Sequence, residues 1–195
     1  MNYIEEEKQF FDGLASSWDQ DEKKDEQKRL SLLSSLPLKS TKNILDIGCG
    51  TGVVSGLLQS LSGAQILGID LSPKMIEIAR KKYEGNKNVS FVQKDFLTFD
   101  ETGFDFALLY NSYPHFMDVL VLSETLNHAL LPGAYFAIVH SMGRKKLDEH
   151  HENVSCSISR KLLSPKEEAK NFSRFFNLVY SIDQEDSLIM LFQKK

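Results

Sequence analysis

The sequence is poor in cysteine and contains no long hydrophobic run. Its two cysteines, Cys49 and Cys156, form neither a disulfide framework nor a paired metal-ligand motif. No apolar stretch approaches the roughly 18 residues of a membrane-spanning helix, and the opening Met-Asn-Tyr-Ile-Glu-Glu-Glu lacks the basic and apolar regions of a signal peptide. We therefore expect a soluble, cytoplasmic protein with no membrane partner.

A large net charge is also missing. The sequence has 27 Asp and Glu residues against 23 Lys and Arg residues, which gives a formal net charge of -4. Such a balance provides no general attraction to a phosphate backbone, so nucleic acid is disfavoured as a partner and a small or neutral ligand fits better. A length of 195 residues with 42% hydrophobic residues suits one domain, over 1–195, with a full core.

The pattern of the chain changes near residue 43. Residues 1–35 are charged and helix-favouring, with apolar anchors between Ile4 and Trp18, and they predict a helix, a break and a second helix. After them, short apolar runs alternate with helical stretches, which is typical of βα units around a parallel sheet. The expected strands are 43–47, 65–69, 89–93, 105–110 and 134–140, and the expected helices between them are 53–61, 73–84 and 118–130.

The last part of the chain predicts a different pairing of strands. A polar stretch over 141–163 precedes Ser164 and Glu167, whose spacing is that of a capping box and indicates the start of a helix. The apolar runs 176–184 and 187–193 lie two residues apart, so they can pair only as an antiparallel hairpin. We therefore predict an α/β fold with a mostly parallel seven-stranded sheet, a C-terminal antiparallel hairpin and helices on both faces.

A glycine-rich turn after the first expected strand indicates a ligand site. Its residues are Gly48, Cys49, Gly50, Thr51 and Gly52. Glycines allow turn conformations that other residues avoid, and they let a ligand lie against the backbone at the end of a strand. Asp46, just before the turn, can accept hydrogen bonds from a cationic or amino group. In nicotinamide enzymes the third glycine comes one position later, in the pattern G-x-G-x-x-G, so the spacing argues against a dinucleotide.

The next two expected strands also end in acidic residues. Asp70 lies 18 residues beyond Gly52, where this topology brings a carboxylate to the two hydroxyls of a ribose. Asp95 ends the third strand and precedes Phe96. Each acid alone could be a turn or capping residue, but three successive strands that each end in one make coincidence a poor explanation.

The strand and turn over 44–52 resemble motif I of the class I S-adenosylmethionine-dependent methyltransferases, and the residues that follow Asp70 and Asp95 are similar to later motifs of that family. The resemblance covers residues 43–133. It implies a Rossmann-like fold with its cofactor-binding core over 43–140, S-adenosylmethionine as cofactor and S-adenosylhomocysteine as product. The cofactor-binding residues that it implies are Asp46, Gly48, Cys49, Gly50, Gly52, Asp70, Leu71, Met75, Asp95, Phe96 and Asn111.

The segment from Phe10 to Asp19 is similar to an F-D-x-x-A-x-x-[YW]-D segment that precedes the core in small-molecule methyltransferases, including those of quinone biosynthesis. There it forms a lid. The resemblance therefore implies that residues 1–35 form a helical lid over the cofactor and that Trp18 helps to exclude water. The alternative for an aromatic residue at helical spacing is simple core packing.

The residues after the fourth and fifth expected strands should face the transferred methyl group, because ligands bind beyond the carboxyl ends of such strands. Enzymes that methylate amide or nucleobase nitrogens carry [ND]-P-P-[YF] after the fourth strand, whereas this chain has Asn111-Ser112-Tyr113 there. We therefore predict an enzyme that methylates a small molecule, with 141–163 as an insertion on the acceptor side and 164–195 as the closing helix and hairpin. The alternative is a related protein that binds the cofactor as a sensor or assembly partner without turnover.

Four of the five histidines fall where the topology places the acceptor. They are His115, His140, His150 and His151. The fifth, His128, lies inside an expected helix and is interpreted as structural. We expect His115 and His140, together with Tyr113, to form a polar catalytic site that removes a proton near neutral pH. Two alternatives stay open, namely a transition metal bound by the four histidines and ordinary surface or hydrogen-bonded histidines.

Overall fold

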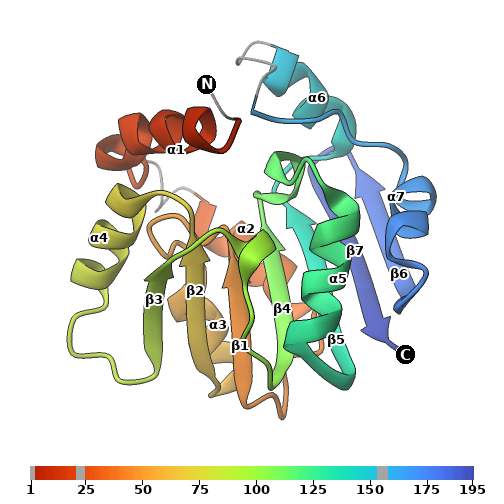
Figure 1. Ribbon diagram of the computed structural model, residues 1–195, viewed down its shortest axis with the longest axis horizontal. Helices are drawn as coiled ribbons and strands as arrows, with labels where there is room; N and C mark the ends of the chain where they lie inside the picture. Colours follow the sequence, from red (N-terminus) through yellow and green to blue (C-terminus); the bar gives the residue numbers. More distant parts are fainter. Residues whose placement is uncertain (1–2, 21–24, 153–157) are drawn as a thin grey trace.

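One sheet of seven strands carries the fold. The computed structural model describes residues 3–20, 25–152 and 158–195, and within them the strand order is β3-β2-β1-β4-β5-β7-β6 (Figure 1). The strands are β1 (Asn43–Ile47), β2 (Gln65–Asp70), β3 (Val89–Gln93), β4 (Phe104–Tyr110), β5 (Leu130–His140), β6 (Phe176–Gln184) and β7 (Ser187–Lys194). β7 runs antiparallel to both β5 and β6, whereas the other neighbouring pairs are parallel. The expected α/β fold with its closing hairpin is confirmed.

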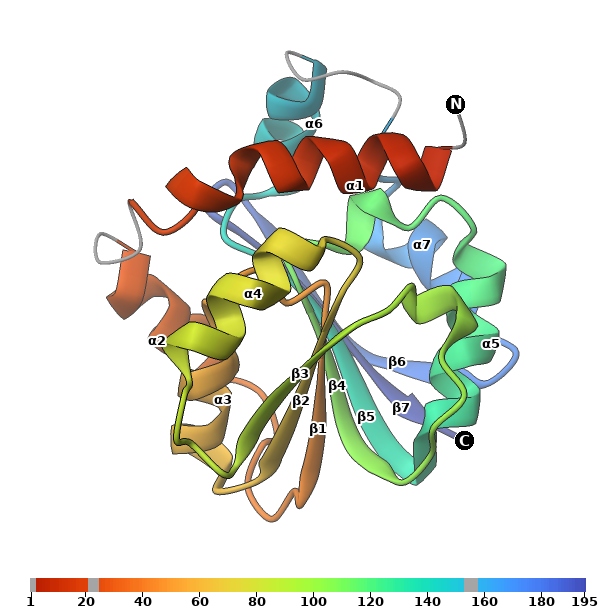
Figure 2. The same ribbon diagram turned by 60° about the vertical axis from the view of Figure 1, so that its left-hand side comes forward.

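Helices cover both faces of the sheet. They are α1 (Tyr3–Leu14), α2 (Glu26–Ser34), α3 (Ser55–Ser62), α4 (Pro73–Lys82), α5 (Val119–Ala129), α6 (Arg144–Glu152) and α7 (Pro165–Phe172). α5 and α7 pack on the face whose core includes Phe136 and Phe192, and α2, α3 and α4 pack on the face whose core includes Ile66 and Leu108. α1 lies apart from both layers, across the carboxyl ends of the parallel strands (Figure 1 and Figure 2).

Local sequence sets the starts of two helices as expected. Ser72 caps α4 by accepting the Met75 N–H at 3.1 Å, and Pro73 occupies the first helical position. At α7 the capping box forms, and the Glu167 side chain accepts the Ser164 N–H at 3.2 Å. These caps fix where the chain turns from strand or loop into helix.

Two elements differ from the expectation. α6 lies within 141–163, a stretch whose polarity alone predicts no helix. The residues of α6 include one apolar side chain, Leu147, which is too few to produce a helical hydrophobic period. β5 begins at Leu130 instead of residue 134, because Leu130 already pairs with Phe104 before a shift in register.

None of the described helices is long and apolar enough to cross a membrane. The expected helix, break and helix over 1–35 correspond to α1 and α2. Cys156 and residues 21–24 of the charged run lie outside the described residues.

Candidate functional site

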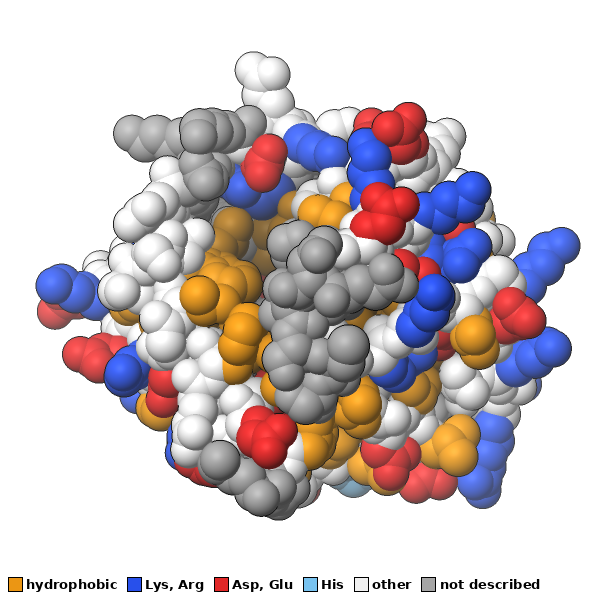
Figure 3. All heavy atoms as spheres, turned by 90° about the horizontal axis from the view of Figure 1, so that it is seen from above, with side chains coloured by type: hydrophobic (Ala, Val, Ile, Leu, Met, Phe, Trp, Pro, Cys, Tyr) orange, Lys and Arg blue, Asp and Glu red, His pale blue; other side chains and the backbone are white. Residues whose placement is uncertain are grey.

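A cavity lies at the carboxyl ends of the parallel strands, beneath α1. Its wall combines the turns after β1, β2, β3 and β4 with residues of α1 and α2. Seen from above, hydrophobic side chains gather around a hollow on this face of the molecule (Figure 3). This is the edge of a parallel sheet at which ligands bind, and it is the position that the sequence predicts.

The glycine-rich turn brings the backbone after β1 close to its neighbours. Gly48, Gly50 and Gly52 have positive φ angles of 66°, 54° and 77°. A Cβ atom on Gly48 would lie 2.6 Å from the Cβ of Ser112, so only glycine lets the turn after β4 approach this closely. Gly48, Cys49 and Gly50 line the cavity, where a ligand can lie against the backbone.

Gly52, the third glycine of the turn, packs against aromatic rings. Among the described residues that line the cavity, Gly52 is missing. A Cβ atom at Gly52 would lie 2.9 Å from the rings of Phe91 and Tyr83, and Tyr83 Oη donates a hydrogen bond to the Gly52 carbonyl at 2.8 Å. Glycine is therefore needed here for packing against β3 and the end of α4, and the expected contact with the cofactor stays a prediction.

Asp46 presents a carboxylate oxygen that lacks a donor. Oδ2 accepts a hydrogen bond from Ser55 Oγ at 2.5 Å, whereas Oδ1 accepts none from the described residues. The residue is 1% exposed, and burial raises its pKa to about 7. An unsatisfied buried acceptor is costly, and an ammonium group beside it would both donate a hydrogen bond and restore its charge. The amino group of the expected cofactor fits this position.

Asp70 both organises the turn and reaches the cavity. Its carboxylate accepts the Gly50 N–H at 2.7 Å and the Ser72 N–H at 2.9 Å. Burial raises its pKa even against these two bonds. Each carboxylate oxygen has further lone-pair capacity, so Asp70 can also accept hydrogen bonds from ribose hydroxyls. The geometry therefore fits the expected role.

The turns after β2 and β3, together with the start of α4, supply an apolar wall with one acid. Leu71, Met75, Asp95 and Phe96 all line the cavity. Asp95 Oδ1 also accepts the Leu97 N–H at 2.9 Å, which fixes the acid at the start of a short helical turn. A flat apolar ring with an amino group at its edge, such as adenine, suits these surroundings.

Asn111 joins the ends of β4 and β5 at the cavity. Its φ of 53° lies in the left-handed region, which asparagine tolerates better than most residues. Its Oδ1 accepts the Ser141 N–H at 2.9 Å, and both residues line the cavity. This position is compatible with the expected contact to the methionine part of the cofactor.

Two aspartates fasten α1 and the turn that follows it to the sheet. Asp12 accepts the Ser72 hydroxyl at 2.5 Å. Asp19 accepts the Thr51 hydroxyl at 2.5 Å and pairs with Lys82 Nζ at 2.6 Å. These are the two acidic positions of the F-D-x-x-A-x-x-[YW]-D pattern, whose partners the sequence alone did not identify.

Trp18 lies at the rim of the cavity. It lines the cavity, is 41% exposed and meets the Phe11 ring edge-to-face at 5.8 Å between centroids. Such exposure argues against simple core packing. The position fits a side chain that closes the entrance.

Glu7, which no motif of the sequence indicates, is a carboxylate that α1 places in the cavity wall. Burial raises its pKa to about 7, and the nearby Asp70 and Asp95 carboxylates add to the rise. Tyr3 Oη donates a hydrogen bond to the His115 carbonyl, which ties the start of α1 to the turn after β4. The available signal was the helical spacing of Glu7 from Tyr3, which puts both on one face of α1.

Among the three expected catalytic side chains, the described cavity wall includes His115 but neither Tyr113 nor His140. Tyr113 is fully buried, and its Oη donates a hydrogen bond to Glu168 at 2.6 Å. His140 is also fully buried, and strand alternation puts it on the same face of β5 as Phe136 in the sheet core. These placements correct the expectation of a catalytic site shared by the three.

Two of the described histidines lie within hydrogen-bond distance of backbone carbonyls. His115 Nδ1 lies 2.8 Å from the Ile158 carbonyl oxygen. His128 Nε2 lies 3.0 Å from the Asp100 carbonyl oxygen, in agreement with the structural interpretation.

The described part of the chain offers no side-chain cluster for the metal that the histidines suggested. Within that part, no group of three or more His, Cys, Asp or Glu side chains is arranged to hold a metal ion. The side chains of His150 and His151 lie outside the described residues, so their role stays a prediction.

Comparisons with known proteins agree with this geometry. A family model described as a methyltransferase domain matches residues 44–133. An O-methyltransferase of Penicillium expansum is 31% identical over 102 residues, which cover 50% of this chain and 37% of the relative. A demethylmenaquinone methyltransferase of Chlorobaculum tepidum is 32% identical over 101 residues, which cover 51% of this chain and 40% of the relative.

A solved structure shows the same fold over almost the whole chain. It is a chain from the complex between the Haloferax volcanii Trm112 methyltransferase activator and a putative methyltransferase, with a TM-score of 0.77 at 20% identity, covering 94% of this chain and 97% of that one. The chain spans less than half of the length of each of the two curated relatives. The segment that matches the family model contains Asp46, the glycine-rich turn, Asp70 and Asp95. Residues 44–133 therefore match a methyltransferase domain, and these relatives and the fold support a class I S-adenosylmethionine-dependent methyltransferase.

Proposed function

We propose that this chain transfers the methyl group of S-adenosylmethionine to a small-molecule acceptor. The observation that carries the proposal is the convergence of Asp46, Asp70 and Asp95 on one cavity beside the glycine-rich turn. Desolvated carboxylates are costly to a folded protein unless a partner satisfies them. A cofactor with an amino group, ribose hydroxyls and an adenine ring offers a partner to each.

The chain's own residues divide the binding of the cofactor among them. Asp46 offers Oδ1 to the amino group, Asp70 offers its oxygens to the ribose, and Leu71 and Met75 offer an apolar wall to the adenine. The bound cofactor supplies a methyl group on a positively charged sulfur. Alignment of the acceptor and exclusion of water then provide most of the acceleration of a direct displacement.

A small acceptor suits the covered shape of the site. α1 lies across the cavity, and Asp12 and Asp19 hold it there, so a macromolecule would have to displace it. Enzymes that methylate amide or nucleobase nitrogens carry two prolines after the fourth strand, and this chain has Ser112 and Tyr113 at those positions. The name of one curated relative, a demethylmenaquinone methyltransferase, also specifies a small acceptor.

Calorimetry and a product assay test the proposal together. We expect one S-adenosylhomocysteine to bind per chain, and we expect S-adenosylmethionine to be converted to S-adenosylhomocysteine with at least one small-molecule fraction of a cell extract. Asp70→Ala should reduce both signals. Tight binding without turnover on every fraction would instead support a sensor or assembly partner, and absence of binding would refute the proposal.

A further inference from the structure

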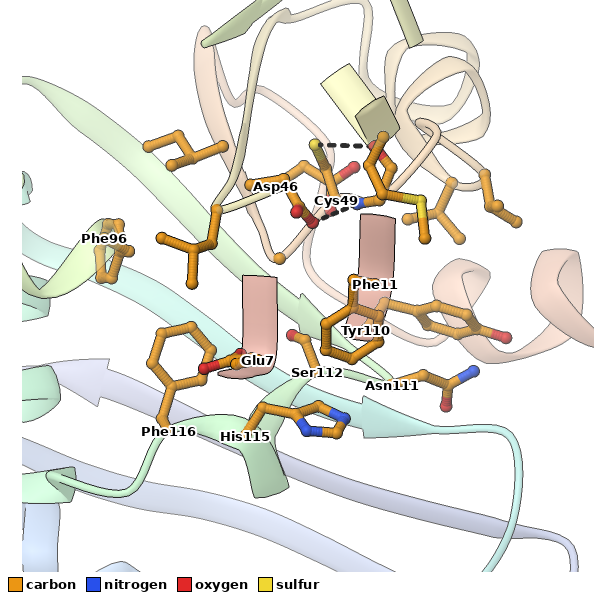
Figure 4. A pocket seen from close by; sticks show the side chains of 18 of the residues that line it. Glu7, Phe11, Asp46, Cys49, Phe96, Tyr110, Asn111, Ser112, His115 and Phe116 are labelled. Atoms are coloured by element: carbon orange, nitrogen blue, oxygen red, sulfur yellow. Dashed lines mark hydrogen bonds between the residues drawn. The ribbon is translucent and has the colours of Figure 1, made fainter. Parts of the chain in front are cut away.

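The cavity has a second half, opposite the glycine-rich turn, that the cofactor contacts leave unused. Figure 4 shows Glu7, Phe116 and His115 on one side of the cavity, with Asp46 and Cys49 on the other. All five residues line the same space. The half around Glu7 is therefore the space in which an acceptor would face the cofactor.

Resting on the proposed function, we propose that Glu7 binds the nucleophilic atom of the acceptor and takes its proton, and that the acceptor is an uncharged or cationic molecule with an apolar body and a hydroxyl or amino group. Ile4 and Phe11 come from α1, and Leu97 and Phe116 follow β3 and β4; all four line the cavity. Apolar walls with a single well-placed polar group are typical of sites for such molecules.

The charge of the cavity disfavours an anionic acceptor. Its described wall contains more carboxylate than cationic side chains. The carboxylates are Glu7, Asp25, Asp46, Asp70 and Asp95, and the cations are Arg29 and Lys94. Lys94 is already paired with Asp100 at 2.6 Å. A carboxylate or phosphate group placed beside Glu7 would meet like charges in a partly desolvated space, whereas a hydroxyl or amino group can donate a hydrogen bond.

Glu7 is suited to receive a proton near neutral pH. The titratable and charged groups that share its cavity come from α1, α2 and the turns after the strands. They are Tyr3, Asp25, Arg29, Asp46, Cys49, Asp70, Lys94, Asp95, Tyr110 and His115. Burial and the carboxylates among them raise the pKa of Glu7 to about 7, and a base is most effective when its pKa lies near the working pH. The carbonyl of Ile158 can only accept a hydrogen bond, so His115 Nδ1 carries the proton of the neutral ring and Nε2 is the ring nitrogen that can accept another.

The step is balanced without a further reactant. As the oxygen or nitrogen of the acceptor bonds to the methyl carbon, the carbon–sulfur bond breaks and its electron pair stays on sulfur. The proton of the hydroxyl or amino group moves to the Glu7 carboxylate, which becomes a neutral carboxylic acid. Release of that proton to water after the products leave returns Glu7 to its starting state.

Matched probes and a matched variant test the proposal. Phenol, benzylamine and benzoate share one ring and differ in the group that would meet Glu7. NMR titrations should compare their affinity for the S-adenosylhomocysteine complexes of wild type, Glu7→Gln and Glu5→Gln, in which Glu5 is an exposed position of the same helix. We expect wild type and Glu5→Gln to prefer phenol and benzylamine over benzoate at least tenfold, and Glu7→Gln to lose this preference.

A second measurement separates proton transfer from a structural role. Carbon-13 NMR of glutamate-labelled protein should show one side-chain carboxyl that titrates near pH 7 in the wild-type complex and shifts when phenol binds. Equal affinity of wild type for the three probes, or the same preference in Glu7→Gln, would overturn the proposal. The wild-type titration needs no variant, so it decides the question even if Glu7→Gln does not fold. Failure of wild type to bind S-adenosylhomocysteine would refute the proposed function instead.

Discussion

The two halves of the cavity are built in different ways. Most of the cofactor half comes from three turns at the ends of β1, β2 and β3, each a short continuous segment with an acid at or near its start. The acceptor half comes from α1 and the turn after β4, and residues 158–168 contact that turn from behind through His115 and Tyr113. These three segments lie far apart in the sequence. A local motif can therefore specify the first half, whereas only tertiary packing brings the second together.

Substitution of Glu168 tests whether packing holds the acceptor half. Glu168 is fully buried, accepts a hydrogen bond from Tyr113 Oη at 2.6 Å and accepts two from Arg160 at 2.8 and 3.1 Å. Removing one partner of a buried ion pair costs about 3–5 kcal/mol because the other charge stays buried. We expect Glu168→Gln to lower the free energy of unfolding in urea by about 3 kcal/mol, since glutamine keeps part of the hydrogen bonding.

Glu167→Gln is the matched control, because Glu167 is exposed and only caps α7. It should cost about 1 kcal/mol or less. Binding of S-adenosylhomocysteine should change little in either folded variant, since both residues lie outside the cofactor half. A Glu168→Gln variant as stable as Glu167→Gln would show that packing around Tyr113 does not hold the acceptor half.

Asp70 provides the corresponding test of the cofactor half. We expect Asp70→Asn to weaken the binding of S-adenosylhomocysteine at least tenfold, because each charge-assisted hydrogen bond contributes roughly 1.5–3 kcal/mol. Asp105 is a matched control, since its Oδ2 also accepts two backbone N–H groups, those of Lys42 and Asn43, but at the opposite end of the sheet. Calorimetry should find normal binding in Asp105→Asn. Equal binding by the two variants would remove Asp70 from the cofactor site.

The same contrast explains what the sequence could predict. The strands, the glycine-rich turn and the acids that end β1 and β2 are visible within windows of a few residues, and the structure confirms their positions. Glu7 and the partners of Asp12 and Asp19 depend on where α1 lies on the sheet, and no short window contains that information.

Tyr113 and His140 illustrate a different limit. His140 ends β5 and Tyr113 follows the end of β4 by three residues, but successive side chains at such positions point in different directions. His140 falls on the core face of β5, whereas the next residue, Ser141, lines the cavity. Distance along the sequence therefore locates the correct edge of the sheet without deciding which side chains enter the site.

The hydrogen bonds of Asp12 and Asp19 hold α1 over both halves of the cavity. Their loss should have a smaller effect than the substitutions of Glu168 and Asp70. We expect the double variant Asp12→Asn/Asp19→Asn to weaken the closed position of α1 by about 2 kcal/mol, because it removes the charge from hydrogen bonds to Ser72, Thr51 and Lys82. Hydrogen exchange of the α1 amides should accelerate, and affinity for S-adenosylhomocysteine should fall several-fold.

Glu5→Gln is the control for this comparison, since Glu5 is exposed and its ion pair with Lys8 is long, at 3.8 Å. Unchanged exchange of α1 in the double variant would show that apolar contacts alone hold the lid. The position of α1 would then depend on tertiary packing, as the acceptor half of the cavity does.

The smallest expected effect concerns Asp46, whose ionisation can be followed through the pH dependence of stability and of cofactor affinity. Burial raises its pKa to about 7 in the protein without cofactor. An acid whose pKa is raised by folding contributes stability at low pH that is lost as the pH rises through the folded value, so this contribution should decline up to about pH 7. The cofactor's amino group binds the ionised carboxylate, so affinity should change in the opposite sense and fall about tenfold from pH 8 to pH 6.

Urea unfolding and calorimetry of wild type should show both trends, the first in the free energy of unfolding and the second in the affinity for S-adenosylhomocysteine. Asp46→Asn should reduce both the pH dependence of the unfolding free energy and the pH dependence of the affinity. If the variant kept both, the titrating group would instead be Asp70 or Glu7, whose pKa values are also raised.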